Sequence, residues 1–213
     1  MAQTATNPQK TWWKWVYGSA CLIIIVAGLY IWSRPSLDWV AKRGVACVIR
    51  GDGDCVYELT PQVEREAYGM PKEAYSRVLK EVVLPHIRSV GRETEVLIGD
   101  NGVALASHEI ITPEGRQWSI GAGASETDEG IKSPSLLTLA VMSACMSENQ
   151  GGVAGVAKAR SQIVFIQKNR AKLEEIGMKG FYRSPDEGLW TWDKWVVHCE
   201  EAIARDAANR NGK

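Results

Sequence analysis

The sequence lacks an excess of charge of either sign. Among its 213 residues, lysine plus arginine and aspartate plus glutamate both number 25, so the formal net charge is zero. A protein that binds nucleic acid usually carries a basic patch or an overall positive field that attracts phosphates. We therefore expect no nucleic-acid partner for this chain.

Patterns that hold metals and cofactors are also missing. The cysteines and histidines do not fall in the short paired spacings that mark zinc sites, and no Cys-x-x-Cys-His run is present for a c-type haem. The glycine-rich stretches 121–125 and 151–155 match neither the Walker pattern nor the dinucleotide pattern. Acidic residues that would repel phosphate follow the first stretch, and the second is interpreted as a flexible helix entry. We expect no metal and no cofactor.

The chain contains only three histidines, so few Cys/His pairs are available for thiol catalysis. A cysteine nucleophile needs an imidazole within reach to accept its proton. His198 and Cys199 are neighbours on a predicted helix, so their side chains diverge by about 100°. His108 with Cys145 is the open combination, and it would make the protein a membrane-anchored enzyme of hydrolase type. We favour the opposite interpretation, in which His108 sits on a sheet face, Cys145 lies in a core helix, and the protein is not an enzyme.

What the chain does contain is a long apolar run near its N-terminus. No charged residue interrupts 16–32, and a helix from Trp12 to Trp32 would cover about 31 Å, the thickness of a bilayer's hydrocarbon core. Tryptophans, which favour the membrane interface, cluster in or beside this run at Trp12, Trp13, Trp15, Trp32 and Trp39. We predict a short tail at residues 1–11, a transmembrane anchor at residues 12–34 and a single soluble domain at residues 35–213.

The residues in and beside the apolar run disagree with two other interpretations of it. A cleaved signal peptide needs small side chains after the run, but Trp32 and Arg34 are bulky or charged. A lipoprotein signal around Cys21 would need the apolar stretch before the cysteine, whereas here it follows. The sequence therefore favours a retained, single-pass signal-anchor, with the lipid bilayer as its first partner.

Charge and cysteine content bear on the side of the membrane that the domain occupies. Basic residues nearly balance across the anchor, but a short tail without acidic residues usually stays inside, which places the domain on the non-cytoplasmic side. In an oxidising compartment, Cys47 and Cys55 could close a disulfide across the flexible 51–54 segment. Cys145 and Cys199 are expected to remain thiols. The alternative, in which all four are buried thiols, stays open.

Periodicity and turn chemistry predict the fold of the soluble domain. Apolar spacing predicts helices over 37–48, 135–146, 153–176 and 185–208, and one that ends before Pro85. Helix starts are expected at Thr60-Pro61, Met70-Pro71, Ser133-Pro134 and Ser184-Pro185. Three strands, 95–99, 103–111 and 117–124, are separated by turn residues. The predicted class is α+β, a small antiparallel β-meander flanked by helices and preceded by one N-terminal transmembrane helix.

The last functional signal is a group of tryptophans near the C-terminus. Trp192 shares the apolar face of the predicted final helix, whereas Trp190 and Trp195 are predicted to project elsewhere on that helix, where an exposed indole would mark a contact surface. The alternative is that both pack under a neighbouring loop. We interpret the protein as a membrane-anchored binding or assembly module, an accessory component of a membrane-associated complex with a protein partner.

Overall fold

The computed structural model describes residues 35–93, 96–99, 102–148 and 154–211. The chain divides into two units, Met1–Pro35 and Ser36–Lys213, and every element described below belongs to the second. No helix within the described ranges is long and apolar enough to cross a membrane. The predicted anchor at residues 12–34 lies outside those ranges.

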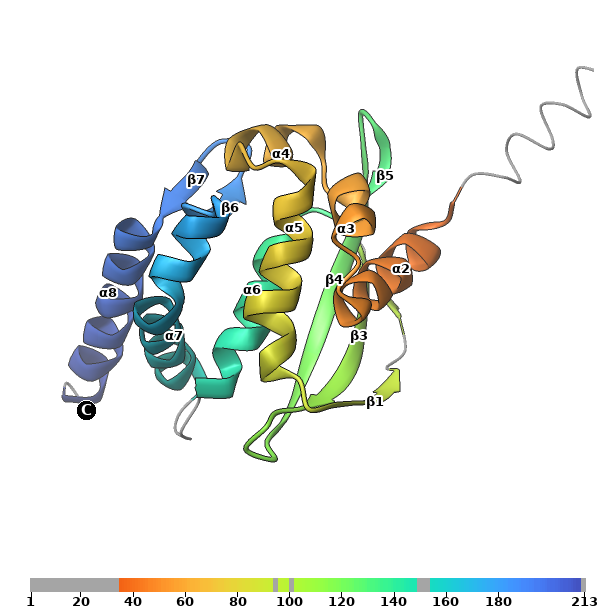
Figure 1. Ribbon diagram of the computed structural model, residues 1–213. Helices are drawn as coiled ribbons and strands as arrows, with labels where there is room; N and C mark the ends of the chain where they lie inside the picture. Colours follow the sequence, from red (N-terminus) through yellow and green to blue (C-terminus); the bar gives the residue numbers. More distant parts are fainter. Residues whose placement is uncertain (1–34, 94–95, 100–101, 149–153, 212–213) are drawn as a thin grey trace, which may run out of the picture. The chain divides into compact units, whose positions relative to one another are not determined.

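The described chain alternates a helical half, a sheet and a second helical half (Figure 1). Its α-helices are α2 (Leu37–Arg50), α3 (Gly53–Leu59), α4 (Gln62–Tyr68), α5 (Lys72–Val78), α6 (Leu136–Cys145), α7 (Ala154–Ile176) and α8 (Trp192–Asn211). Its strands are β1 (Ser89–Glu93), β2 (Leu97–Ile98), β3 (Ala104–Ile111), β4 (Gln117–Thr127), β5 (Gly130–Lys132), β6 (Gly180–Ser184) and β7 (Gly188–Thr191). A π-helical turn, Leu79–Val83, and a 3₁₀ turn, Leu84–His86, continue α5, and a second 3₁₀ turn, Met146–Glu148, follows α6. The predicted α+β class is confirmed.

The main sheet is antiparallel throughout, with the order β1, β3, β4, β5 and with β2 also paired to β3. Because side chains alternate along a strand, the register assigns each residue to a face. His108 lies opposite Ile120 and Ala106 opposite Ala122, on the face that packs against α2. Leu105 lies opposite Gly123, on the other face.

Helix α2 begins and ends as its sequence predicts. The hydroxyl of Ser36 accepts a hydrogen bond from Trp39 N at 3.2 Å, and Gly51 ends the helix in the left-handed conformation at φ 67°. Gly44 permits close packing, because a Cβ there would lie 3.0 Å from Ala122 Cβ on the sheet. The buried face of α2 therefore covers β3 and β4 directly.

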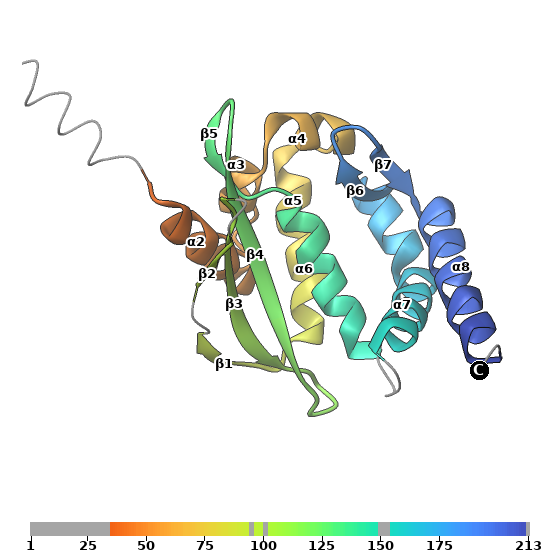
Figure 2. The ribbon, with the colours of Figure 1, turned by 180° about the vertical axis from the view of Figure 1, so that it is seen from behind.

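The second helical half packs as a set of neighbouring helices. α6 contacts β4 on one side and α7 on the other, and α8 packs along α7 (Figure 2). The β6–β7 hairpin contacts α4 and α8 and so joins the two halves. Within this half, Phe165, Leu173, Phe181 and Trp192 are almost completely buried.

Several predicted helix starts are wrong in detail. Ser184-Pro185 does not open a helix: Ser184 ends β6, Gly188 turns the chain at φ 64°, and α8 begins only at Trp192. The 51–54 segment is not a loop throughout, because Asp52 accepts a hydrogen bond from Cys55 N and starts α3. A helix does begin after Thr60-Pro61, because α4 starts at Gln62, but Thr60 does not cap it: its hydroxyl donates to Val56 O at 2.7 Å and closes α3.

Candidate functional site

The face of the sheet opposite α2 carries a groove. Gly121 and Gly123 form its floor, opposite Ser107 and Leu105 across the β3–β4 pair. A Cβ at Gly121 would meet nothing closer than Ala106 O at 3.4 Å, so an ordinary side chain would fit there and fill the space. The groove exists because these two strand positions lack side chains.

The walls of the groove come from both sides of the floor. Leu97 and Leu105 lie on the β2–β3 side, and Leu139 and Ser143 of α6 lie on the other. Figure 2 shows β3, β4 and α6 side by side, with no described helix in front of them. The volume of this open groove is about 670 Å³, within the range of about 300–1,000 Å³ typical of binding pockets.

The lining of the groove is apolar and uncharged. Its polar side chains are three serines, Ser107, Ser119 and Ser143, and the hydroxyl of Ser143 already donates to Leu139 O at 2.9 Å. Leu97 and Leu105 are directly opposite each other in the register, and they are 67% and 52% exposed. No titratable group belongs to the described lining, so the groove holds no base that could activate the serine hydroxyls, and its lining suits binding.

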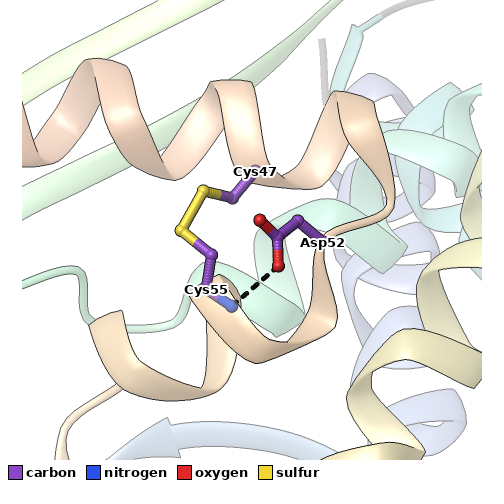
Figure 3. Close-up of side chains that lie close together, drawn as sticks. All are labelled: Cys47, Asp52 and Cys55. Atoms are coloured by element: carbon purple, nitrogen blue, oxygen red, sulfur yellow. Dashed lines mark hydrogen bonds between the residues drawn. A yellow bond between two sulfur atoms is a disulfide. The ribbon is translucent and has the colours of Figure 1, made fainter.

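Cys47 and Cys55 are joined by a disulfide that links α2 to α3, with 5.9 Å between their Cα atoms (Figure 3). Asp52 lies beside them, and its Oδ1 accepts a hydrogen bond from Cys55 N at 3.0 Å. The Nη2 of Arg50 lies 3.6 Å from the sulfur of Cys47. The bond therefore fixes the angle at which the chain turns from the first helix into the second.

The same three side chains could be considered as metal ligands, because their ligand atoms lie within 4.8 Å of one another. Cysteine binds metals as the thiolate, and two sulfurs bonded to each other cannot serve in that form. The carboxylate of Asp52 is already used in capping α3. We assign this corner a structural role.

The structure does not support the catalytic combination of His108 and Cys145. His108 lines a cavity on the α2 side of the sheet with Trp39, Arg43 and Cys55, and Cys145 does not belong to that cavity. Cys145 is completely buried at the end of α6, and this burial raises the pKa of its thiol well above the usual range. A thiol held protonated and closed off from substrate is not a nucleophile.

Trp190 and Trp195 do not form the exposed contact surface that the sequence suggests. They are only 8% and 4% exposed, because Trp190 belongs to strand β7 and Trp195 faces α7. Phe181 packs edge-on against Trp192 and Trp195, with 5.0 Å between ring centroids in each case. The indoles hold the hairpin and α8 onto α7. Both are packed inside the domain as the alternative interpretation expected, but α7 and the β6–β7 hairpin cover them in place of a loop.

A buried carboxyl group lies at the junction of α4 and α6. Glu64 is fully buried, and its Oε2 accepts a hydrogen bond from Ser135 N at 2.7 Å, one residue before α6. Burial raises the pKa of Glu64 to about 7, against the lowering effect of that hydrogen bond. Glu64 does not line the groove, so it positions α6 and plays no direct part in binding there.

Sequence reasoning missed the residues that form the groove. The only signal was that Leu105 alternates with Ala104 and Ala106 in a strand whose partner carries glycines, and the strand register is needed to use it.

Comparisons with protein-family models, with curated proteins and with solved structures find no match for this chain.

Proposed function

We propose that the protein is a membrane-anchored binding or assembly module that holds a protein partner in the groove formed by β3, β4 and α6. The observation that carries this proposal is the pair Leu97 and Leu105, both exposed beside a glycine floor. Fully burying a leucine side chain is worth about 1.5–3 kcal/mol, so covering what these two expose would contribute about 2–3.5 kcal/mol. An apolar segment of a partner protein would supply that cover.

The membrane part of the proposal rests on the sequence of residues 12–34 and their tryptophan clusters. The disulfide between Cys47 and Cys55 supports a domain on the non-cytoplasmic side, because disulfides persist in oxidising compartments. A domain held at the membrane by one span, with an uncharged groove on its surface, suits an accessory component of a membrane-associated complex. The groove's lack of titratable residues favours this role over the hydrolase alternative.

The proposal is tested by changing the groove and purifying the full-length protein from gently solubilised native membranes. Leu105→Asp puts a charge in the groove and Gly121→Val fills its floor, so both should lose the partner chain that copurifies with the wild type. Val63→Asp is the matched control, because Val63 is 49% exposed on α4 and does not line the groove. If both groove variants recover the partner as well as the control does, the groove is not the binding site.

A further inference from the structure

A third cavity lies between α7 and α8, and it shares no lining residue with the groove or with the cavity beside His108. Its volume is about 200 Å³. Its lining comes from successive turns of both helices, with one residue each from α6 and β6: Gly155, Lys158, Ala159, Gln162, Trp195, His198, Cys199, Ala202, Met142 and Arg183. None of these residues is acidic.

The most informative residue of this cavity is Gln162. It is only 4% exposed, and its Oε1 accepts hydrogen bonds from Trp195 Nε1 at 3.2 Å and from the thiol of Cys199 at 3.3 Å. Two donors on one oxygen fix the orientation of the amide. Its NH₂ group has no hydrogen-bond partner among the described residues and reaches the open space of the cavity instead of being enclosed in the core. The cavity that Gln162 lines offers the place for an acceptor.

The thiol that orients this amide is itself kept neutral. Burial raises the pKa of Cys199 to about 11, so at neutral pH it stays a donor and places no negative charge in the cavity. Gln162 therefore keeps its orientation over the physiological range of pH.

Two cationic side chains, Lys158 and Arg183, line the same cavity as the Gln162 amide. Lys158 lies one turn before Gln162 on α7, and no carboxylate among the described residues is within ion-pair distance of it. Arg183 reaches the cavity from β6; its Nε pairs with Glu187 at 3.1 Å, and the guanidinium lies over the Trp190 ring. His198 adds an imidazole. The polar groups of the cavity are thus mostly donors and cations. No carboxylate belongs to its lining, and Lys158 is the cation without an ion-pair partner among the described residues.

The remaining lining selects the size and shape of a ligand. Trp195, Met142 and the two alanines are apolar, so the walls suit a short apolar group. The volume is below the roughly 300 Å³ at which sites for drug-sized ligands begin. We propose that this cavity binds a small organic anion, a carboxylate or a phosphate monoester carried on an apolar group, with Gln162 and Lys158 donating to its oxygens.

The test uses the full-length protein in lipid nanodiscs and fluorine NMR of three probes. Fluorobenzoate and fluorophenyl phosphate carry the two anionic groups, and fluorobenzamide is their neutral counterpart. Empty nanodiscs correct for partitioning into lipid. We expect line broadening of at least one anion and none of the amide, and the anion that binds more tightly identifies the ligand class.

Two variants separate the proposed contacts from general effects. Gln162→Glu keeps the acceptor for Trp195 and Cys199 but replaces the donor with a negative charge, and Lys158→Gln removes the cation. Each should weaken binding of the anion at least about tenfold. Gln167→Glu, on an exposed turn of the same helix, and Lys179→Gln, also exposed, make the same chemical changes elsewhere and should leave binding unchanged.

Near-UV circular dichroism shows whether Gln162→Glu remains folded, and Lys158 is exposed, so its variant tests the proposal even if the first does not fold. Three results would overturn the proposal. The first is that the fluorobenzamide signal broadens as much as the signals of the anions. The second is that folded Gln162→Glu and Lys158→Gln both bind the anion with wild-type affinity. The third is that the wild type binds neither anion.

Discussion

Replacing Glu64 by glutamine should change how the stability of the domain depends on pH. The side chain is fully buried, and its Oε1 has no hydrogen-bond partner in the described structure. Its Oε2 is held by Ser135 N, and a glutamine oxygen could accept that bond equally well. The substitution therefore removes a titration without removing the contact.

The magnitude follows from the raised pKa. Burial moves the pKa of Glu64 from 4.5 to about 7, so the folded state holds its proton more tightly than the unfolded state does. The contribution to stability is fully present below about pH 4.5 and is lost as the pH rises through 7. At about 1.4 kcal/mol per pKa unit, the wild type should lose about 3 kcal/mol from this group between those limits.

Urea unfolding of residues 35–213 at pH 4.5 and pH 8 measures this effect. Other groups titrate in the same range, so the informative quantity is the wild-type loss minus the loss in Glu64→Gln. We expect Glu64→Gln to be close to the wild type at pH 4.5 and more stable at pH 8 by about 3 kcal/mol. A stability difference between the two proteins that does not change with pH would refute the argument.

Three further predictions follow. The full-length chain should stay with membranes after a carbonate wash and begin at or near Met1; a mature N-terminus beyond Trp32 would show a cleaved signal instead. Replacing Cys47 and Cys55 together by alanine should lower the free energy of unfolding by about 2–3 kcal/mol. Mass spectrometry of non-reduced peptides tests the bridge itself: if both thiols are alkylated in every native copy, the bridge does not form. Gly53→Ala should cost about 1–3 kcal/mol in urea unfolding, because its Cβ would collide with the backbone of α5, whereas Gly155→Ala, with open space around it, should cost nothing.

The helices that could be predicted are those whose signals are local. The apolar spacing that predicts α2 and the Gly51 that ends it both lie within this one segment of sequence. The observed helix begins and ends close to the predicted bounds. α6 and α7 were also predicted to within one residue at each end, because their apolar content needs no knowledge of the partner elements. Where a segment decides its own conformation, sequence reasoning succeeds.

The error at Ser184 has a physical cause. Its hydroxyl accepts a hydrogen bond from Glu187 N at 3.2 Å, which is the bond expected of a helix cap. The same bond also closes a turn, and here Gly188 takes a positive φ that directs the chain back as β7. Pairing with β6 decides that the segment after Ser184 forms a strand and not a helix, since Phe181 lies opposite Trp190 in the hairpin. That pairing also buries Trp190, which explains why it could not be recognised as a core residue.

The groove could not be predicted because it depends on contacts between distant segments. Gly121 and Gly123 fall within the predicted strand 117–124, which the structure confirms as part of β4, but their functional role was considered only for phosphate binding. They form the floor of the groove only because the register places Leu105 opposite Gly123 and because α6 packs beside β4. Strand β1, whose residues are all exposed, was missed for the same reason: it lacks an apolar alternation and exists through its pairing with β3.

Site-specific photo-crosslinking in intact native membranes tests the central claim, that the groove holds a protein partner. A photoreactive residue is placed at Leu105 in the groove or at Val63 on α4, two exposed positions of similar accessibility. The account predicts a discrete adduct with another protein from position 105, which disappears when Gly121→Val fills the groove, and no such adduct from position 63. The same yield from both positions, or an adduct from position 105 that survives Gly121→Val, would contradict it.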